Sequence, residues 1–239
     1  MPELNFENKT VLVTGATRGI GASIATAFLT AGAKVIGTGT HAASSGSFDE
    51  YFQADFTDVD QISACADYVR STKPDVLINN AGINKNLTFV EIDPIMFQRI
   101  QQVNVFAPFS LCQAAIPSMQ RKGWGRIVNI SSIWGKIGKE HRASYSASKF
   151  ALDGLTLSLA AEHAADGILA NCVAPGFTDT ELTQKMLGEE GIHKILTTVP
   201  IRRMASVEEI ARFVVWLSSP ENSYITGQNI AIDGGFSRV

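Results

Sequence analysis

Ser132, Tyr145 and Lys149 are the side chains in this sequence whose types and spacing indicate catalysis. Tyr145 and Lys149 are four residues apart, so they share one face if this segment is a helix. Ser132 follows the apolar run 126–131, which has the composition of a buried strand. A strand end that faces a helix start would bring a hydroxyl, a phenol and an ammonium together.

This trio predicts proton exchange with an alcohol or a carbonyl oxygen. A free phenol has a pKa of about 10, and a neighbouring ammonium favours the phenolate. We therefore expect Lys149 to lower the pKa of Tyr145 enough for acid–base catalysis near neutral pH, with Ser132 holding the reacting oxygen. A lone Tyr-x-x-x-Lys is more often a solvated helix face, so this interpretation depends on the residues upstream.

A glycine-rich turn near the N-terminus gives that support. It lies between a β-branched run at 9–14 and a helical pattern at 22–31, and it reads Gly15-Ala16-Thr17-Arg18-Gly19-Ile20-Gly21. Glycines let the backbone approach a pyrophosphate, and the helix N-terminus supplies N–H groups. The spacing differs from the general G-x-G-x-x-G motif, and a plain tight turn is the alternative. Its place between a strand and a helix favours phosphate binding.

The end of the second predicted strand, 34–39, bears on the choice between NAD and NADP. The chain continues through Thr40 and His41 without an Asp or Glu. An acidic side chain there would bind the ribose 2′-hydroxyl of NAD and repel the 2′-phosphate of NADP. Its absence, with Arg18 in the glycine loop, predicts NADP(H). Thr40 is an additional candidate contact, and a solvated loop cation is the alternative role for Arg18.

Residues after the third and fourth predicted strands, 51–54 and 75–79, are further candidate contacts. Asp55, with Phe56 beside it, either caps the next helix or accepts from the adenine amino group, and Asp58 is the better cap. The fourth strand ends in Asn79-Asn80-Ala81-Gly82. Amides at a strand end can bind the neighbouring backbone and the cofactor ribose, whereas a simple turn is the alternative.

Asn104 interrupts an apolar helical region that joins helices predicted at 94–103 and 106–119. Asp93 is the expected cap of the first helix, with Pro94 near its first position. A buried Asn needs hydrogen-bond partners, and a polar break within a helix can mark a functional kink.

The remaining segments continue the alternation of strands and helices. We expect an irregular link at 42–50, because this segment is short for a helical crossover. Downstream we expect a helix at 145–163 with its cap at 166–167, strands at 168–174 and 228–232, and a helix at 207–217 capped by Ser206. The polar segment 181–200 is interpreted as a mobile helical flap over the site.

This alternation predicts a single α/β domain spanning 1–239, a Rossmann-type doubly wound parallel sheet of about seven strands with helices on both faces. The glycine turn, Asn80, Ser132 and Pro175 all follow strands. In such sheets the carboxyl ends of the strands form the ligand-binding edge.

Composition excludes other classes. The 239 residues are 45% apolar, and the net charge of -3 gives no basic field for nucleic acid. The three cysteines, Cys65, Cys112 and Cys172, form no C-x-x-C motif, which indicates a reduced compartment and no metal site. Without a signal-like start or an apolar run of about 20 residues, we expect a soluble cytoplasmic protein that spans no membrane.

Taken together, these motifs resemble the short-chain dehydrogenase/reductase family over nearly the whole chain. The matching positions are Thr-Gly-x-x-x-Gly-Ile-Gly at 14–21, Asn-Asn-Ala-Gly at 79–82, Asn104, the set Ser132, Tyr145 and Lys149, and Pro-Gly-x-x-x-Thr at 175–180. The resemblance implies hydride transfer between a nicotinamide cofactor and a carbonyl or alcohol carbon.

The resemblance also implies a role for each matching residue. Tyr145 would be the general acid in reduction, and Lys149 would hold the nicotinamide ribose and lower the pKa of Tyr145. Ser132 would orient the substrate oxygen, and Asn104 would hold a water in the proton relay. Further cofactor contacts are implied at Pro175, Gly176, Thr178 and Thr180.

Within the family the chain is most similar to bacterial 3-oxoacyl-acyl-carrier-protein reductases, on its length and on segments 34–38, 174–177 and 224–227. This similarity implies an NADPH-dependent homotetramer of fatty acid biosynthesis, joined by helices 106–119 and 145–163 and by the last strand. Its substrate would be a 3-oxoacyl thioester of acyl-carrier protein or CoA.

Two departures keep a second substrate class open. Segment 160–166 has no Lys or Arg and ends at Asp166, which would repel an acidic carrier protein, although Arg121 and Lys122 remain near the other docking patch. Four basic residues precede Tyr145, either as a solvated edge or as contacts for a phosphate or carboxylate: Lys136, Lys139, His141 and Arg142. The alternative substrate is a sugar, polyol or other small, possibly anionic, alcohol or ketone.

A protein that binds the cofactor without catalysis is the hypothesis from another class. Such relatives usually lose the tyrosine or the lysine, and this sequence keeps both Tyr145 and Lys149. The sequence therefore favours an enzyme.

Overall fold

The computed structural model describes residues 4–41 and 46–238. Within that part of the chain, seven strands form one parallel sheet in the order β3-β2-β1-β4-β5-β6-β7. The strands are β1 (Thr10–Val13), β2 (Lys34–Gly39), β3 (Glu50–Gln53), β4 (Val76–Asn79), β5 (Gly125–Ile130), β6 (Ile168–Pro175) and β7 (Asn229–Ile232). This is the strand order of a Rossmann-type sheet, so the predicted fold class is confirmed.

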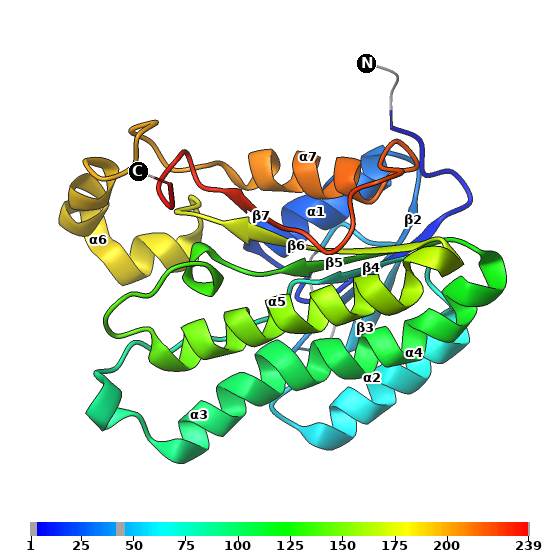
Figure 1. Ribbon diagram of the computed structural model, residues 1–239, viewed down its shortest axis with the longest axis horizontal. Helices are drawn as coiled ribbons and strands as arrows, with labels where there is room; N and C mark the ends of the chain where they lie inside the picture. The colour runs from blue at the N-terminus through cyan, green and yellow to red at the C-terminus, as the bar shows by residue number, and fades with distance from the viewer. Residues whose placement is uncertain (1–3, 42–45, 239) are drawn as a thin grey trace.

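Helices cover both faces of this sheet (Figure 1). On one face lie α1 (Gly19–Thr30) and α7 (Val207–Leu217), and on the other lie α2 (Val59–Thr72), α4 (Ala107–Lys122) and α5 (Ala143–His163). The short helix α3 (Pro94–Gln101) continues through a π-helical turn, η2 (Gln102–Phe106), into α4. Helix α6 (Glu181–Leu196) follows β6 and lies beyond the end of the sheet (Figure 1).

Two apolar clusters, one on each side of the sheet, form the core. Successive residues of a strand point to opposite faces, so Leu12 joins the cluster against α2 and α4, whereas Val11 and Val13 join the cluster against α1 and α7. The central strands are apolar on both faces because both faces are buried. This arrangement fixes the strand ends that carry the candidate site.

The predicted N-terminal helix caps are confirmed, whereas the cap expected at 166–167 closes the 3-10 turn η4 (Ala164–Asp166) that follows α5. Asp58 accepts a hydrogen bond from the Asp60 N–H at the start of α2, and Asp93 accepts one from Ile95 N–H at the start of α3. At α7 a capping box joins Ser206 to residue 209, a glutamate. Each side chain pairs a backbone donor that the first helical turn leaves free.

Two of the expected segments are only partly tested by the structure. Residues 42–45 of the expected link lie outside the described residues, and 46–49 are irregular before β3 begins at Glu50. In the expected flap, Gly188 breaks α6 with φ 63° and ψ 174°. The mobility of this helix stays a prediction. In the described part of the chain, no helix is both long enough and apolar enough to cross a membrane.

Candidate active site

The glycine-rich turn packs tightly against the end of β4. Gly15 and Gly19 have φ of 63° and 55°, a backbone region that favours glycine. A Cβ at Gly21 would lie 2.2 Å from the Gly15 carbonyl oxygen and 2.4 Å from Nδ2 of Asn80. Glycine is therefore required at Gly21 so that the first turn of α1 can approach the loop, and the residues present fit a phosphate cradle.

Replacing Gly21 with alanine should weaken cofactor binding and stability together, because the new methyl group pushes α1 away from the loop. We expect the dissociation constant for NADPH to rise at least about tenfold, the equivalent of about 1.4 kcal/mol. Fluorescence titration and thermal melting measure the two effects. Gly138→Ala is the matched control, since a Cβ at Gly138 would meet nothing within 4 Å. Wild-type affinity in the Gly21 variant would contradict the cradle.

Thr14 and Asn80 join the glycine turn to the loop after β4. Oγ1 of Thr14 accepts hydrogen bonds from the N–H groups of Asn80 and Ala81, both at 3.0 Å. The Asn80 side chain donates to the carbonyl oxygens of Thr14 (2.9 Å) and Gly15 (3.1 Å). Of the two roles weighed for the Asn80 amide, the structure shows the bond to neighbouring backbone, and its contact with a ribose stays a prediction.

The end of β2 offers a cation and hydroxyls without a carboxylate. Arg18, at the N-cap of α1, and Thr40 are both exposed. Thr17 packs against Gly39, where a Cβ would lie 2.7 Å from Cγ2 of the threonine. The next acidic residue in the sequence, Asp49, accepts from the Val35 N–H at 2.7 Å, near the start of β2.

Asp55 and Phe56 have structural partners of their own. Oδ1 of Asp55 accepts from the N–H and the hydroxyl of Thr57 at 2.9 and 2.8 Å. The Phe56 ring is buried in the core, and its carbonyl oxygen accepts from Gln102 at 2.9 Å. Asp55 thus closes a local turn while Asp58 caps α2, and the adenine contact stays a prediction.

Asn104 is completely buried in the π-helical turn η2. Its Oδ1 accepts from the Ile83 N–H, and its Nδ2 donates to the Ile83 carbonyl oxygen, each at 2.9 Å. Nδ2 also donates to Oγ of Ser148 at 3.0 Å. Because both amide hydrogens are used, the side chain holds the loop after Gly82. A water in a relay would have to bind elsewhere on this residue, which stays a prediction.

Ser132 and Tyr145 meet at the carboxyl end of β5. Ser132 is 8% exposed, lies two residues after the end of β5, and accepts from the Trp134 N–H at 3.2 Å. Tyr145, in the first turn of α5, is partly buried, and its hydroxyl lies close enough to Ser132 for the serine to lower its pKa. The structure therefore brings together the hydroxyl and the phenol that the sequence pairs.

Lys149 lies one helical turn after Tyr145 and is 3% exposed. Its Nζ donates to the Ile130 carbonyl oxygen at 2.7 Å and lies 5.5 Å from the centroid of the Tyr145 ring. A Cβ on Gly82 would lie 3.7 Å from this nitrogen, so the loop after β4 reaches the same place. Burial lowers the pKa of Lys149 to about 8.

The predicted direction of the Tyr145 pKa is wrong for this structure. Burial raises the pKa of Tyr145 above its usual value and outweighs the opposing effects of the Ser132 hydrogen bond and the Arg142 charge. Lys149 is not among the groups that lower the pKa of Tyr145 in this structure. In the molecule as described, Tyr145 is a protonated phenol at neutral pH.

The segment after β6 links the sheet edge to α6. The Gly176 N–H donates to the Ile232 carbonyl oxygen at 2.9 Å. Thr178 is buried, and its hydroxyl donates to the Gly176 carbonyl oxygen at 3.4 Å. Thr180 caps α6 by accepting from the Thr183 N–H at 3.1 Å. A Cβ on Gly19 would lie 3.7 Å from Cγ2 of Thr180, so α6 begins against the glycine turn. The cofactor contacts expected from Pro175 onward stay predictions.

The four basic residues before Tyr145 have different surroundings in the structure. Lys136 donates to the Asn229 carbonyl oxygen at 2.6 Å, and Lys139 forms an ion pair with Glu140 at 2.8 Å. His141 is exposed, whereas Arg142 is half-buried and its guanidinium carbon lies 5.8 Å from the centroid of the Trp134 ring. Of the four side chains, Arg142 has the environment of a binding residue.

Sequence reasoning missed three residues that position the site. Thr14 holds the loop after β4, Ser148 joins Asn104 to α5 by donating to the Tyr145 carbonyl oxygen at 2.7 Å, and Trp134 lies against Arg142. Thr14 belongs to the matched motif at 14–21 without a role having been assigned to it, and Ser148 precedes Lys149, so their positions in the sequence are the signal that could have found these roles.

Comparison with known proteins identifies the relatives of this chain. A family model described as Enoyl-(Acyl carrier protein) reductase matches residues 15–237. The 3-oxoacyl-[acyl-carrier-protein] reductase FabG of Escherichia coli (strain K12) is 37% identical over 245 residues, which cover 99% of this chain and 100% of FabG.

Solved structures with the same fold include proteins assigned to two kinds of substrate. A candidate NAD(P)-dependent gluconate 5-dehydrogenase from Beutenbergia cavernae, with bound NADP, has a TM-score of 0.91 and 34% identity over 98% of both chains. A candidate betaketoacyl-ACP reductase has a TM-score of 0.90 and 36% identity over 98% of this chain and 100% of that chain.

Proposed function

This chain belongs to the short-chain dehydrogenase/reductase family of oxidoreductases, and we propose that it transfers hydride between NADP(H) and a carbonyl or alcohol carbon. The observation that carries the proposal is the group formed by Ser132, Tyr145 and Lys149 at the carboxyl end of β5. It adjoins the loop after β4, which is bonded to the glycine turn. A proton donor and a phosphate cradle therefore share one edge of the sheet.

Bound NADPH would supply the hydride for reduction of the carbonyl carbon. Tyr145 gives its hydroxyl proton to the carbonyl oxygen, which then becomes the alcohol oxygen, and Ser132 holds that oxygen by a hydrogen bond. Lys149 binds the ribose next to the nicotinamide, and the Arg142 charge opposes the effect of burial on the Tyr145 hydroxyl. Asn104 holds the loop after β4 in place. In oxidation each of these proton movements runs in reverse.

NADP(H) is the preferred cofactor in this proposal. Two observations support it: Arg18 is exposed, and the end of β2 at Thr40 has no carboxylate. The next acidic residue, Asp49, accepts from the Val35 N–H near the start of β2 and so lies away from that end. The relative from Beutenbergia cavernae is described with bound NADP. A 2′-phosphate carries charge that Arg18 can neutralise and that a carboxylate would repel.

Placing a carboxylate at the end of β2 should reverse this preference. Thr40→Asp is expected to raise KM for NADPH by about 100-fold, the equivalent of about 2.8 kcal/mol, and to lower KM for NADH. Initial rates with both cofactors measure the change. Thr40→Asn has the same shape without the charge and should leave the order of preference intact. A wild-type enzyme that prefers NADH would contradict the cofactor proposal.

A 3-oxoacyl thioester, reduced to the 3-hydroxyacyl product, is the first substrate candidate. It is supported by the FabG relative and by the candidate betaketoacyl-ACP reductase structure. The direct test is to mix the enzyme with NADPH and acetoacetyl-CoA and to measure NADPH oxidation by the loss of absorbance of the reduced nicotinamide. Turnover of other carbonyl compounds without any turnover of acetoacetyl-CoA would remove this candidate and leave the reaction class standing.

The two positions weighed for an acidic carrier protein, Lys122 and Asp166, both have partners within this chain. Lys122 is held by Asp75 and by the Lys73 carbonyl oxygen, both at 2.8 Å. At the end of α5, Asp166 is exposed to solvent in part and accepts from Gln120 at 2.8 Å. A negative group at a docking surface disfavours a negative partner.

A small sugar acid, polyol or other alcohol or ketone is the second candidate. The relative from Beutenbergia cavernae is described as a gluconate dehydrogenase. In this chain the specific observation is Arg142, a half-buried cation three residues before the proposed proton donor. A carbonyl panel of neutral and charged compounds separates the two candidates.

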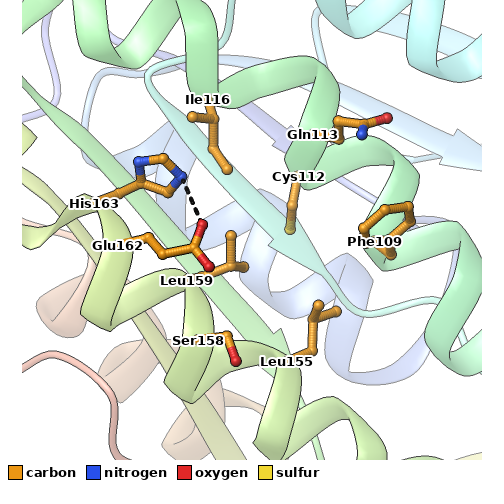
Figure 2. Close-up of a pocket in the computed structure, with 9 residues that line it drawn as sticks. All are labelled: Phe109, Cys112, Gln113, Ile116, Leu155, Ser158, Leu159, Glu162 and His163. Atoms are coloured by element: carbon orange, nitrogen blue, oxygen red, sulfur yellow. Dashed lines mark ion pairs between the residues drawn. The ribbon is translucent and has the colours of Figure 1, made fainter.

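The outer face of α4 and α5 is the proposed subunit contact of a homotetramer. Four large apolar side chains on or next to these helices are more than 40% exposed: Phe106, Phe109, Phe150 and Leu157. Figure 2 shows the hollow between the two helices, with Phe109 and Leu155 at one end and Ile116 and His163 at the other. Contiguous exposed apolar surface of this kind marks an association site. Sedimentation velocity measures the mass, and a monomer at micromolar concentration would contradict the contact.

A further inference from the structure

Arg142 differs from the other arginines in its surroundings. Two arginines are shielded from solvent, Arg126 completely and Arg142 in part, and the others are exposed. The Arg126 guanidinium donates to the carbonyl oxygens of Gly125, Gly167 and Asn222. Among the residues that the structure describes, Arg142 has neither a hydrogen-bond acceptor nor an ion-pair partner, and its contact is the Trp134 ring.

A half-buried guanidinium such as Arg142 normally has a hydrogen-bond acceptor or a carboxylate beside it. Partial removal of a guanidinium from water costs free energy unless an acceptor replaces the lost hydrogen bonds. The ring face of Trp134 attracts the positive charge and so recovers part of this free energy. It offers no pair of acceptor atoms that matches the forked N–H groups of the guanidinium. The donor edge of Arg142 is therefore available to a planar, doubly accepting anion.

Trp134 is itself held rigidly. It is 7% exposed, and its ring packs edge-to-face against Phe177 and Phe236 at centroid distances of 6.2 and 6.0 Å. The indole follows Ser132 by two residues, in the turn that begins at that serine. The Arg142 guanidinium therefore lies against a fixed ring that is two residues from the serine proposed to hold the reacting oxygen.

Arg142 and Tyr145 are also neighbours on α5. Arg142 is the N-cap residue and Tyr145 the third residue of the helix, so the two side chains leave the same face. The Arg142 charge lowers the pKa of the Tyr145 hydroxyl, an effect that needs proximity. The cation and the phenol therefore lie close to each other at the start of α5.

We propose that Arg142, backed by the Trp134 ring, is a carboxylate-binding site that selects substrates with a free carboxylate near the reacting carbonyl. The substrate class is a small oxo acid in reduction, or the corresponding hydroxy acid in oxidation. This inference rests on the proposed hydride transfer at Tyr145 and selects the second substrate candidate, because the acyl carbonyl of a thioester has no charge for the arginine to bind. Two parallel N–H···O bonds are the geometry in which Arg recognises carboxylate.

The other three cations of the segment do not share this role. Lys136 is directed to the Asn229 carbonyl oxygen, and Lys139 is paired with Glu140. His141 is exposed with φ of 62°, in the turn before the helix. Lys139 therefore provides the matched control, because its replacement removes one positive charge from the same segment without altering Arg142.

The kinetic experiment compares oxo acids with their ethyl esters as substrates for NADPH oxidation. Pyruvate, acetoacetate and levulinate place the carboxylate at three distances from the ketone, and each ester removes the charge. Arg142→Gln is expected to lower kcat/KM for the preferred acid by about 100-fold and for its ester by less than about threefold. Arg142→Lys should recover part of the loss, and Lys139→Gln should behave as wild type. Melting curves of all variants verify the fold.

A binding experiment gives a readout that needs no turnover. Calorimetric titration of malonate into the enzyme saturated with NADP+ should show binding that Arg142→Gln abolishes and Lys139→Gln retains, while neutral malonamide should not bind. Malonate binding that survives Arg142→Gln would overturn the site, and so would equal losses for acid and ester in the kinetic series. Arginine-dependent binding of malonate without turnover of any carbonyl compound would uphold the site and refute the proposed reaction.

Discussion

Replacement of Tyr145 with phenylalanine should lower kcat by about 1,000-fold while leaving the affinity for NADPH within about twofold of wild type. A positioned general acid contributes about 100- to 10,000-fold to a reaction rate. The substitution deletes one oxygen atom, whose partner in the structure is Ser132, and leaves the ring where Lys149 contacts it. The loss should therefore be confined to proton transfer.

Steady-state rates with a saturating carbonyl substrate measure kcat, and fluorescence titration measures NADPH affinity. Tyr68→Phe is the matched control, because it also deletes one phenol oxygen. That hydroxyl, on α2, donates to Glu50 on β3 at 2.9 Å. That variant should turn over substrate at the wild-type rate. If Tyr145→Phe kept more than about a tenth of the activity, the proton donor would have to be another group.

The direction of the Tyr145 pKa shapes the expected pH profile. Because burial raises this pKa, the phenol keeps its proton at neutral pH and is ready to act as an acid in reduction. Oxidation of an alcohol needs the deprotonated form, so its rate should increase with pH over the range where reduction is constant. The cation that opposes burial here is Arg142, whereas the sequence assigned that task to Lys149.

The parts that could be predicted from the sequence depend on local patterns. The bounds of β2 and α7 match the prediction because β-branched runs and a capping serine act within a few residues. Ser132 and Tyr145 meet because a strand end and a helix start converge at one edge of a parallel sheet. These relations require only the order of elements.

The parts that could not be predicted depend on packing between distant segments. Lys149 donates to the carbonyl oxygen of Ile130 at the end of β5, and burial, not the lysine, sets the direction of the Tyr145 pKa. Likewise, the partners of Asn104 come from Ile83 and Ser148, which no spacing rule connects to it. A sequence gives the charge of a side chain, whereas its burial and partners follow from tertiary structure.

Lys149→Met should make the protein more stable at neutral pH and nearly inactive. The lysine is 3% exposed, and burial lowers its pKa from 10.5 to about 8, so keeping the charge inside costs on the order of 3 kcal/mol. Methionine has a similar length and no charge. It loses the bond to the Ile130 carbonyl oxygen, worth about 1 kcal/mol and somewhat more if that acceptor stays unpaired. We therefore expect a net gain of about 1 kcal/mol in the free energy of unfolding. We also expect kcat/KM to fall by at least about 100-fold, because the proposed contact with the cofactor ribose is lost.

The gain from Lys149→Met should disappear as the pH rises. Below pH 8 the lysine is charged in both the folded and the unfolded chain, so the wild type bears the full cost of burial. Between pH 8 and 10.5 the unfolded state binds more protons than the folded state, and wild-type stability rises with pH relative to the variant. Urea unfolding at several pH values measures the difference, and Lys122→Met is the control, since that ammonium has a carboxylate partner in Asp75 and should give no gain. The contradicting result is a Lys149→Met variant that is less stable than wild type at pH 7, with a stability difference that stays constant up to pH 10. Burial of the Lys149 charge would then not destabilise the folded protein.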